Sequence, residues 1–245
     1  MATKKAEIAH EAEAAKQQYE ARMGFDPINA PSKWIKSKKE RISNSLALMK
    51  NDCILDFGSA SCEVSEIYAN DGYFIVAGDI SKEMLLISQK RTQKYNRPSP
   101  HYIVFDGEYL PLRNNTFNKI ICWNVIHHFV SPDKALSEIH RVLDKNGRVL
   151  FLEPLSTNPY RLLFEYRFRK HHQGIERSFR KKQFLNILEN IGYEVDDVSY
   201  EIHSLPDWIL KERRGFQKFY TNVSISLSTI FSRIFGSILV ICRKV

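Results

Sequence analysis

The sequence predicts an α/β fold built on one doubly wound, mostly parallel sheet of seven strands, with an antiparallel last strand. Short apolar runs alternate with helix-like segments from residue 51 onward, which is typical of consecutive β-α-β units. Five such units in a row require helices on both faces of the sheet. The chain has 245 residues, 43% of them hydrophobic and 26% charged, which suits one domain with one core.

The expected elements follow from these alternations in chain order. The expected strands are residues 53–57, 74–78, 101–105, 119–123, 148–153, 193–200 and 237–243. The expected helices are residues 6–21, 32–49, 63–70, 82–95, 132–142 and 180–191. Residues 1–50 would form an N-terminal helical extension, and residues 51–245 the sheet domain, with insertions at about 155–179 and 204–235.

The charge of the chain is concentrated in one place. The net charge is +8, and residues 158–182 alone hold eight Arg or Lys against two Glu. Such a cluster can attract an acidic substrate, a phosphate-rich membrane surface or nucleic acid, or it can be a solvated helix face. Both interpretations stay open at this point.

The remaining composition argues for the cytoplasm and against a metal site. The four cysteines form no CxxC pair, so neither a disulfide framework nor a zinc site is expected. The first 20 residues contain no apolar core typical of a secretory signal. Arg233 interrupts the longest apolar stretch, residues 223–242, which argues against a transmembrane span. Peripheral membrane contact stays open, because the second insertion mixes bulky apolar and basic residues.

The first chemical signal is ILDFGSASC, residues 54–62, where a buried strand ends in an acid and a glycine before a helix. In α/β sheets, ligands bind where a strand's carboxyl end leads into a helix. A nicotinamide dinucleotide would want GxGxxG, but Ala60 and Glu63 occupy the second and third glycine positions. A carboxylate such as Asp56 suits instead a ligand with a cationic ammonium or sulfonium group.

Two further acids end the next two strands. Asp79 lies in VAGDIS, 21 residues after Gly58, where a carboxylate can accept hydrogen bonds from the two hydroxyls of a ribose. Asp106 opens DGEYLPL, where it could meet the amino group of an adenine. An acid at a strand end can also cap the following helix, and Asp79 before Ser81 could do so.

Over residues 51–192 the sequence resembles the class I S-adenosylmethionine-dependent methyltransferases, in particular the small-molecule, type 11-like branch. The resemblance rests on five elements in the right order: ILDFGSASC, VAGDIS, DGEYLPL, FNKIICWNVIHHF and RVLDKNGRVLFLEP. The family's first loop reads acid-x-Gly-x-Gly-x-Gly, whereas this chain has Ala60 and Cys62 in place of the second and third glycines. The resemblance implies a Rossmann-like fold, S-adenosylmethionine as cofactor, and direct in-line transfer of its methyl group.

The resemblance also implies which residues bind the cofactor. The first loop would border the methionine end, Asp79 would hold the ribose, Asp106 with Gly107 would lie against the adenine, and the residues after the fourth strand would flank the methionine or the methyl. The full set of cofactor-binding residues implied is Asp56, Gly58, Ala60, Asp79, Ile80, Asp106, Gly107, Asn124 and Val125.

His127 and His128 are the candidate catalytic residues. Histidine titrates near neutral pH and could take a proton from an oxygen or nitrogen acceptor. Histidines also occur at this position in the family without a shared catalytic role, so a shaping role stays open. In-line methyl transfer needs little beyond alignment of the reacting atoms.

The first insertion is the candidate acceptor site. Its aromatic residues interleave with arginines, which favours an amphipathic or anionic small-molecule or lipid-like acceptor under a helical lid, or else a surface helix. The substrate-binding residues expected there are Tyr160, Arg161 and Tyr166.

The sequence leaves two alternative functions open. One is a non-catalytic binding or scaffold protein, supported by the altered loop at Ala60 and Cys62. The other is an RNA methyltransferase, supported by the basic charge; the segment after the fourth strand lacks the Asn-Pro-Pro-aromatic sequence and the catalytic cysteine pair that this function would call for.

Overall fold

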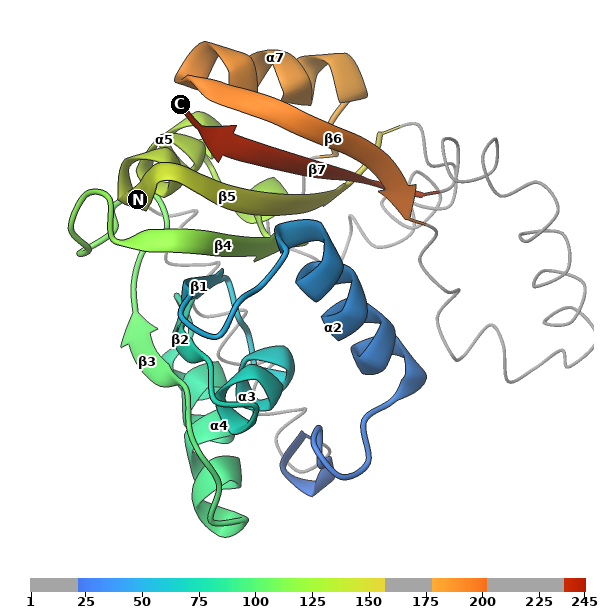
Figure 1. Ribbon diagram of the computed structural model, residues 1–245, viewed down its shortest axis with the longest axis vertical. Coiled ribbons are helices and arrows are strands. Elements are labelled where there is room, and N and C mark those ends of the chain that lie inside the picture. The colour runs from blue at the N-terminus through green and yellow to red at the C-terminus, as the bar shows by residue number, and fades with distance from the viewer. Residues whose placement is uncertain (1–21, 157–177, 202–235) are drawn as a thin grey trace, which may run out of the picture.

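A seven-stranded sheet forms the centre of the molecule (Figure 1). The computed structural model describes residues 22–156, 178–201 and 236–245. In these residues the strand order is β3-β2-β1-β4-β5-β7-β6. The strands are β1 (Cys53–Phe57), β2 (Phe74–Asp79), β3 (His101–Val104), β4 (Phe117–Trp123), β5 (Leu143–Pro154), β6 (Tyr193–Glu201) and β7 (Ser237–Lys244).

The first five strands pair in parallel, and β7 pairs antiparallel with both β5 and β6. Central strand β1 lies between β2 and β4, so the winding of the chain reverses there. The predicted fold class, a mostly parallel doubly wound sheet with an antiparallel last strand, is confirmed.

Helices cover both faces of the sheet (Figure 1). One face packs against α2 and α3 through a cluster that includes Ile42, Tyr68 and Ile121, and against α4 through Leu85, which lies on Ala77 of β2. The other face packs against α5 and α7 through Leu136, Phe151 and Phe184. A parallel sheet covered on both faces needs strands that are mostly apolar, as the buried runs of β1 and β4 are. The helices are α2 (Lys33–Leu46), α3 (Glu63–Asn70), α4 (Lys82–Lys94), α5 (Pro132–Val142) and α7 (Lys181–Ile191), with the short 3-10 helix η1 (Ile126–His128).

Several predicted boundaries were wrong by a few residues. Helix α2 ends at Leu46 rather than at residue 49, because Ala47 adopts a left-handed conformation with φ 49° and its N–H bonds back to the carbonyl of Asn44. Strand β5 begins at Leu143 rather than at residue 148, because Leu143 pairs with Phe117 ahead of an irregularity in the β4–β5 ladder. That same pairing extends β4 two residues upstream.

Parts of the prediction fall on residues outside the described ranges. These are the helix at 6–21 and most of both insertions. The ends of the first insertion are described, and they lie side by side, since Phe179 pairs with Leu155 and its carbonyl accepts from the N–H of Ser156 at 2.9 Å. No helix in the described ranges combines the length and the apolar character that crossing a bilayer demands.

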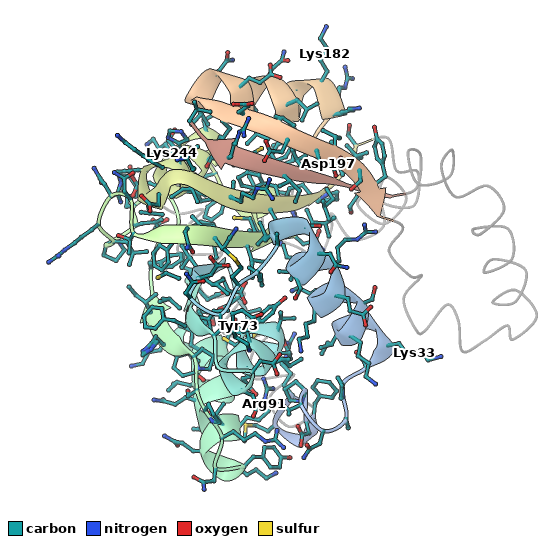
Figure 2. All side chains as sticks on the ribbon, in the orientation of Figure 1. Lys33, Tyr73, Arg91, Lys182, Asp197 and Lys244 are labelled. Carbon is teal, nitrogen blue, oxygen red and sulfur yellow. The ribbon has the colours of Figure 1, made fainter. Side chains whose placement is uncertain are left out.

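A buried ion pair joins α3 to α4. The guanidinium of Arg91, labelled on α4 in Figure 2, is fully buried and binds the equally buried carboxylate of Glu66, with 2.6 Å between Nη2 and Oε1. The same Nη2 donates to the carbonyl of Ser61 at 2.7 Å, and Nη1 donates to the carbonyl of Arg22 at 2.9 Å. Arg91 therefore fixes the backbone of the loop after β1 through the carbonyl of Ser61.

Replacing Arg91 by Met should lower the free energy of unfolding by about 3 to 5 kcal/mol, because it leaves the Glu66 carboxylate buried without its cation. Urea denaturation followed by circular dichroism measures this loss. The control is Arg243→Met, which removes the pairs of the surface residue Arg243 with Glu194 and Asp196 and should change stability far less. Equal losses in the two variants would contradict the role given to Arg91.

Candidate functional site

A cleft opens at the carboxyl ends of the parallel strands, where the winding of the sheet reverses at β1 and β4. Such a crevice is where open α/β sheets bind ligands. Its empty space, counted with the part open to solvent, is about 710 Å³. The residues that line it are Phe57, Gly58, Ala60, Asp79, Ile80, Phe105, Gly107, Asn124, Val125, His128 and Phe129.

The structure brings most of the predicted cofactor-binding residues together in this one cleft. They come from four loops that are distant in sequence: those after β1, β2, β3 and β4. Asp56 and Asp106 are not among the lining residues. The predicted residues on the wall are Gly58, Ala60, Asp79, Ile80, Gly107, Asn124 and Val125.

The loop after β1 is tightly wound although two of its expected glycines are absent. Gly58, Ala60 and Cys62 all have left-handed backbone conformations, with φ of 74°, 47° and 58°. Non-glycine residues adopt this conformation at a cost of roughly 1 to 2 kcal/mol each. The Gly58 N–H donates to the carbonyl of Gly78 at 2.8 Å, and Cys62 donates to the carbonyl of Ser59 at 2.9 Å. The loop therefore keeps a glycine-type geometry without the glycines.

Two glycines in the wall allow close approach of neighbouring side chains. A Cβ on Gly58 would lie 2.2 Å from Cγ2 of Val125. A Cβ on Gly107 would lie 2.5 Å from the rings of both Phe57 and Phe129. Real side chains do not approach so closely, so these positions require glycine for the cleft to keep its shape.

Asp79 connects two loops of the cleft. Its Oδ2 accepts a hydrogen bond from the Ala60 N–H at 2.8 Å, and its Oδ1 accepts from the Ser81 N–H at 2.9 Å. The Ser81 hydroxyl, in turn, caps α4 by accepting from the Met84 N–H. A carboxylate has about four acceptor positions, so two backbone N–H groups do not by themselves fill those of Asp79.

Asp56 and Asp106 act within the protein instead of forming the wall. Asp56 is buried and accepts from the Ser65 hydroxyl, and burial raises its pKa, opposed by the charge of Lys38 and by this hydrogen bond. Burial likewise lowers the pKa of Lys38, and the nearby Asp56 charge opposes that shift. Asp106 accepts from the Glu108 N–H at 2.9 Å and thereby shapes the turn after β3.

The two candidate catalytic histidines differ in position. His128 lines the cleft, whereas His127 does not and is only 5% exposed. Their rings lie 4.1 Å apart, centroid to centroid. The Nδ1 atom of His127 is 2.7 Å from Oε2 of Glu153, a carboxylate at the end of β5. His128 is therefore the histidine placed to meet a ligand.

Sequence reasoning missed the aromatic part of the wall. Phe57 packs against Phe105 with 5.3 Å between ring centroids, and against Phe129 with 5.7 Å. The signal available in the sequence was an aromatic residue next to two of the three predicted acids: Phe57 follows Asp56, and Phe105 precedes Asp106. The predicted substrate-binding residues, Tyr160, Arg161 and Tyr166, lie outside the described residues.

An acceptor atom on the wall fits a cationic ligand. Asn124 follows β4 in a left-handed conformation with φ 57°, and its N–H donates to the Leu152 carbonyl. Its Oδ1 is buried and has no hydrogen-bond partner within the described part of the chain. A buried acceptor without a donor is costly, and an ammonium group in the cleft would satisfy it. The cleft thus fits S-adenosylmethionine at this point.

Replacing Ala60 by Gly should raise the free energy of unfolding by about 0.5 to 1 kcal/mol, because it removes left-handed strain that exceeds the entropic cost of the added glycine. Urea denaturation measures the change. The control is Ala69→Gly inside α3, which should destabilise by about 1 kcal/mol or more. A loss at Ala60 as large as that at Ala69 would refute the strained-loop interpretation.

Comparisons with known proteins agree with this geometry. Residues 55–151 match the family model described as methyltransferase domain. The ubiquinone/menaquinone biosynthesis C-methyltransferase UbiE of Blochmanniella pennsylvanica is 34% identical over 97 residues, which are 39% of this chain and 38% of that protein. A malonyl-[acyl-carrier protein] O-methyltransferase of Buchnera aphidicola is 32% identical over 155 residues, which are 60% of this chain and 58% of that protein. The chain therefore spans less than two thirds of either relative.

A solved structure supports the fold. Magnesium protoporphyrin IX methyltransferase of Synechocystis, crystallised with bound S-adenosylhomocysteine (SAH), superposes on this chain with a TM-score of 0.66 at 13% sequence identity. The superposition covers 99% of this chain and 100% of that chain. At that identity the likeness concerns the fold alone. Together with the match of residues 55–151 to the methyltransferase domain model, it confirms the resemblance of this chain to the class I S-adenosylmethionine-dependent methyltransferases.

Proposed function

We propose that this protein transfers the methyl group of S-adenosylmethionine to a small-molecule acceptor. The observation that carries the proposal is the cleft in which Asp79, Asn124 and the left-handed loop from Gly58 to Cys62 meet. The matched family and the methyltransferase names of the two relatives support the reaction class.

Each group of the wall has a role in binding the cofactor. The carboxylate of Asp79 would accept from the ribose hydroxyls, and Oδ1 of Asn124 would accept from the ammonium of the methionine end. Ile80 and Phe105 offer apolar surface on which an adenine ring could pack. When bound, S-adenosylmethionine supplies an electrophilic methyl group on a sulfonium sulfur.

His128 is the residue proposed to take a proton from the acceptor. It is the histidine on the cleft wall, and imidazole accepts a proton near neutral pH. Holding the acceptor oxygen, nitrogen or carbon in line with the methyl group would supply most of the remaining rate acceleration through proximity.

The acceptor proposed is a small molecule or a lipid-like compound. One relative is named for quinone biosynthesis and another for a malonyl thioester on a carrier protein, and these names support that class. Tyr160, Arg161 and Tyr166 of the first insertion are proposed to contact the acceptor, on their sequence pattern alone. The alternative of a non-catalytic scaffold loses its main argument, because Ala60 and Cys62 keep the conformation expected of glycine.

Replacing Asp79 by Ala should weaken binding of S-adenosylhomocysteine by about 1.5 to 3 kcal/mol for each charge-assisted hydrogen bond lost. Isothermal titration calorimetry measures this, with NAD as a ligand that should give no heat of binding. The matched control is Asp106→Ala, which removes a strand-end acid that does not line the cleft. A folded Asp79→Ala variant with wild-type affinity would contradict the assignment of Asp79 to the ribose. Wild-type protein that binds neither S-adenosylmethionine nor S-adenosylhomocysteine would contradict the proposed function.

Replacing His128 by Ala should lower turnover by about 100-fold or more and leave the affinity for S-adenosylhomocysteine unchanged, if the imidazole takes the proton. Transfer of a tritiated methyl group to quinol and acyl-thioester acceptors measures turnover. His101→Ala is the control, since that exposed residue stacks on Phe74 and does not line the cleft. A loss below about tenfold would leave His128 only a shaping role.

A further inference from the structure

Glu153 is a fully buried acid with no place in the mechanism above. It follows the apolar run Leu150 to Leu152 near the end of β5, and its side chain has no exposed surface. It does not line the cleft. Burying a carboxylate costs free energy of folding unless hydrogen-bond donors surround it. The donors that surround Glu153 therefore indicate its structural role.

Those donors all belong to the segment that forms one wall of the cleft. Oε1 accepts from the N–H groups of Val125 at 3.0 Å and Ile126 at 2.8 Å. Oε2 accepts from the N–H of His127 at 3.3 Å and lies 2.7 Å from its Nδ1. One carboxylate thus binds three successive backbone amides and a side chain.

The sheet explains why a carboxylate is needed there. Trp123 and Leu152 form the last pair of the β4–β5 ladder, and Asn124 then turns away from the sheet with a positive φ. The amides that follow lose strand partners before η1 can supply any. Glu153, one residue beyond Leu152, reaches across and satisfies them.

The same contact fixes the protonation pattern of His127. An ionised carboxylate only accepts hydrogen bonds, so with Glu153 ionised the proton between the two groups lies on Nδ1 of His127. The His127 ring then packs against the ring of His128, which is on the wall of the cleft. The backbone of Val125, whose side chain contacts Gly58, is held by the same carboxylate.

We propose that Glu153 is the positioning residue of the cleft: its carboxylate holds η1 and His127 in place, and thereby sets Val125 and His128 on the wall that meets cofactor and acceptor. The proposal rests on the proposed function for its consequence in binding. The positioning itself can be tested without any ligand.

Two variants separate the functions of the carboxylate. Glu153→Gln retains one oxygen for the amides of Val125 and Ile126 but offers N–H donors toward His127, so Nδ1 of His127 has to become an acceptor. Glu153→Ala removes every acceptor. The control is Tyr193→Phe, which deletes a buried hydrogen bond to the Leu136 carbonyl on α5 and leaves the cleft untouched.

Nuclear magnetic resonance of the ligand-free protein gives the first readout. The ¹⁵N shifts of His127 should report a protonated Nδ1 in the wild type and an unprotonated Nδ1 in Glu153→Gln. Amide exchange at Val125 and Ile126 should accelerate by about 100-fold or more in Glu153→Ala but little in Glu153→Gln or Tyr193→Phe, because only the first loses the acceptor. An unchanged His127 pattern in Glu153→Gln would overturn the proposal, and this variant carries the test if Glu153→Ala does not fold.

Calorimetric titration with S-adenosylhomocysteine gives the second readout. The dissociation constant should rise about tenfold or more in Glu153→Ala and stay within about threefold of wild type in Glu153→Gln and Tyr193→Phe. Loss of amide protection at Val125 and Ile126 with unchanged affinity would show that the cleft does not depend on Glu153. Absence of binding in the wild type would instead count against the proposed function and leave the ligand-free readouts valid.

Discussion

The parallel pairing of β1 with both β2 and β4 is the constraint on which the site depends. In that arrangement three strands of different sequence position deliver their carboxyl ends to one edge of the sheet. The loop from Gly58 to Cys62, the acid Asp79 and the turn at Asn124 therefore converge, although 66 residues separate Gly58 from Asn124. The apolar character of β1 and β4 buries both faces of this junction and keeps it rigid.

Buried acids then fix the loops that the strands deliver. Glu66 binds Arg91, which holds the carbonyl of Ser61 behind the first loop. Glu153 binds the amides of Val125 and Ile126 on the inner side of the loop after β4. In both cases the polar group is satisfied inside the core, while the opposite side of the loop faces the cleft. The wall is thus preorganised from the interior of the protein, which reduces the ordering cost when a ligand binds.

Sequence patterns predicted the sheet and its order of elements well. Strands β1, β2, β4 and β5 each contain a strongly apolar run, and each helix begins where the periodicity changes, so their existence followed from local residues. The boundaries at Ala47 and Leu143 depended on a left-handed cap and on a ladder irregularity, which are set by contacts rather than by local pattern. The same limit explains why the loop around Ala60 supported the non-catalytic alternative, although its backbone keeps the conformation of a glycine loop.

For the acids of the site, too, the local sequence predicted the position at a strand end, whereas contacts between distant segments decide whether the side chain lines the cleft. The position of Asp79 at a strand end predicted its place in the cleft, whereas the same pattern at Asp56 and Asp106 leads to internal hydrogen bonds. Which strand-end acid faces the ligand depends on how the neighbouring loops fold over it. Glu153 was not identified at all, although a charge at the end of the apolar run RVLFLEP was a visible signal.

The decisive experiment is a crystal structure of the protein grown with S-adenosylhomocysteine. The ligand should occupy the cleft at the carboxyl ends of β1, β2 and β4, with its ribose hydroxyls on Asp79 and its ammonium on Oδ1 of Asn124. Ligand bound elsewhere, or bound in this cleft without contact to either side chain, would contradict this prediction.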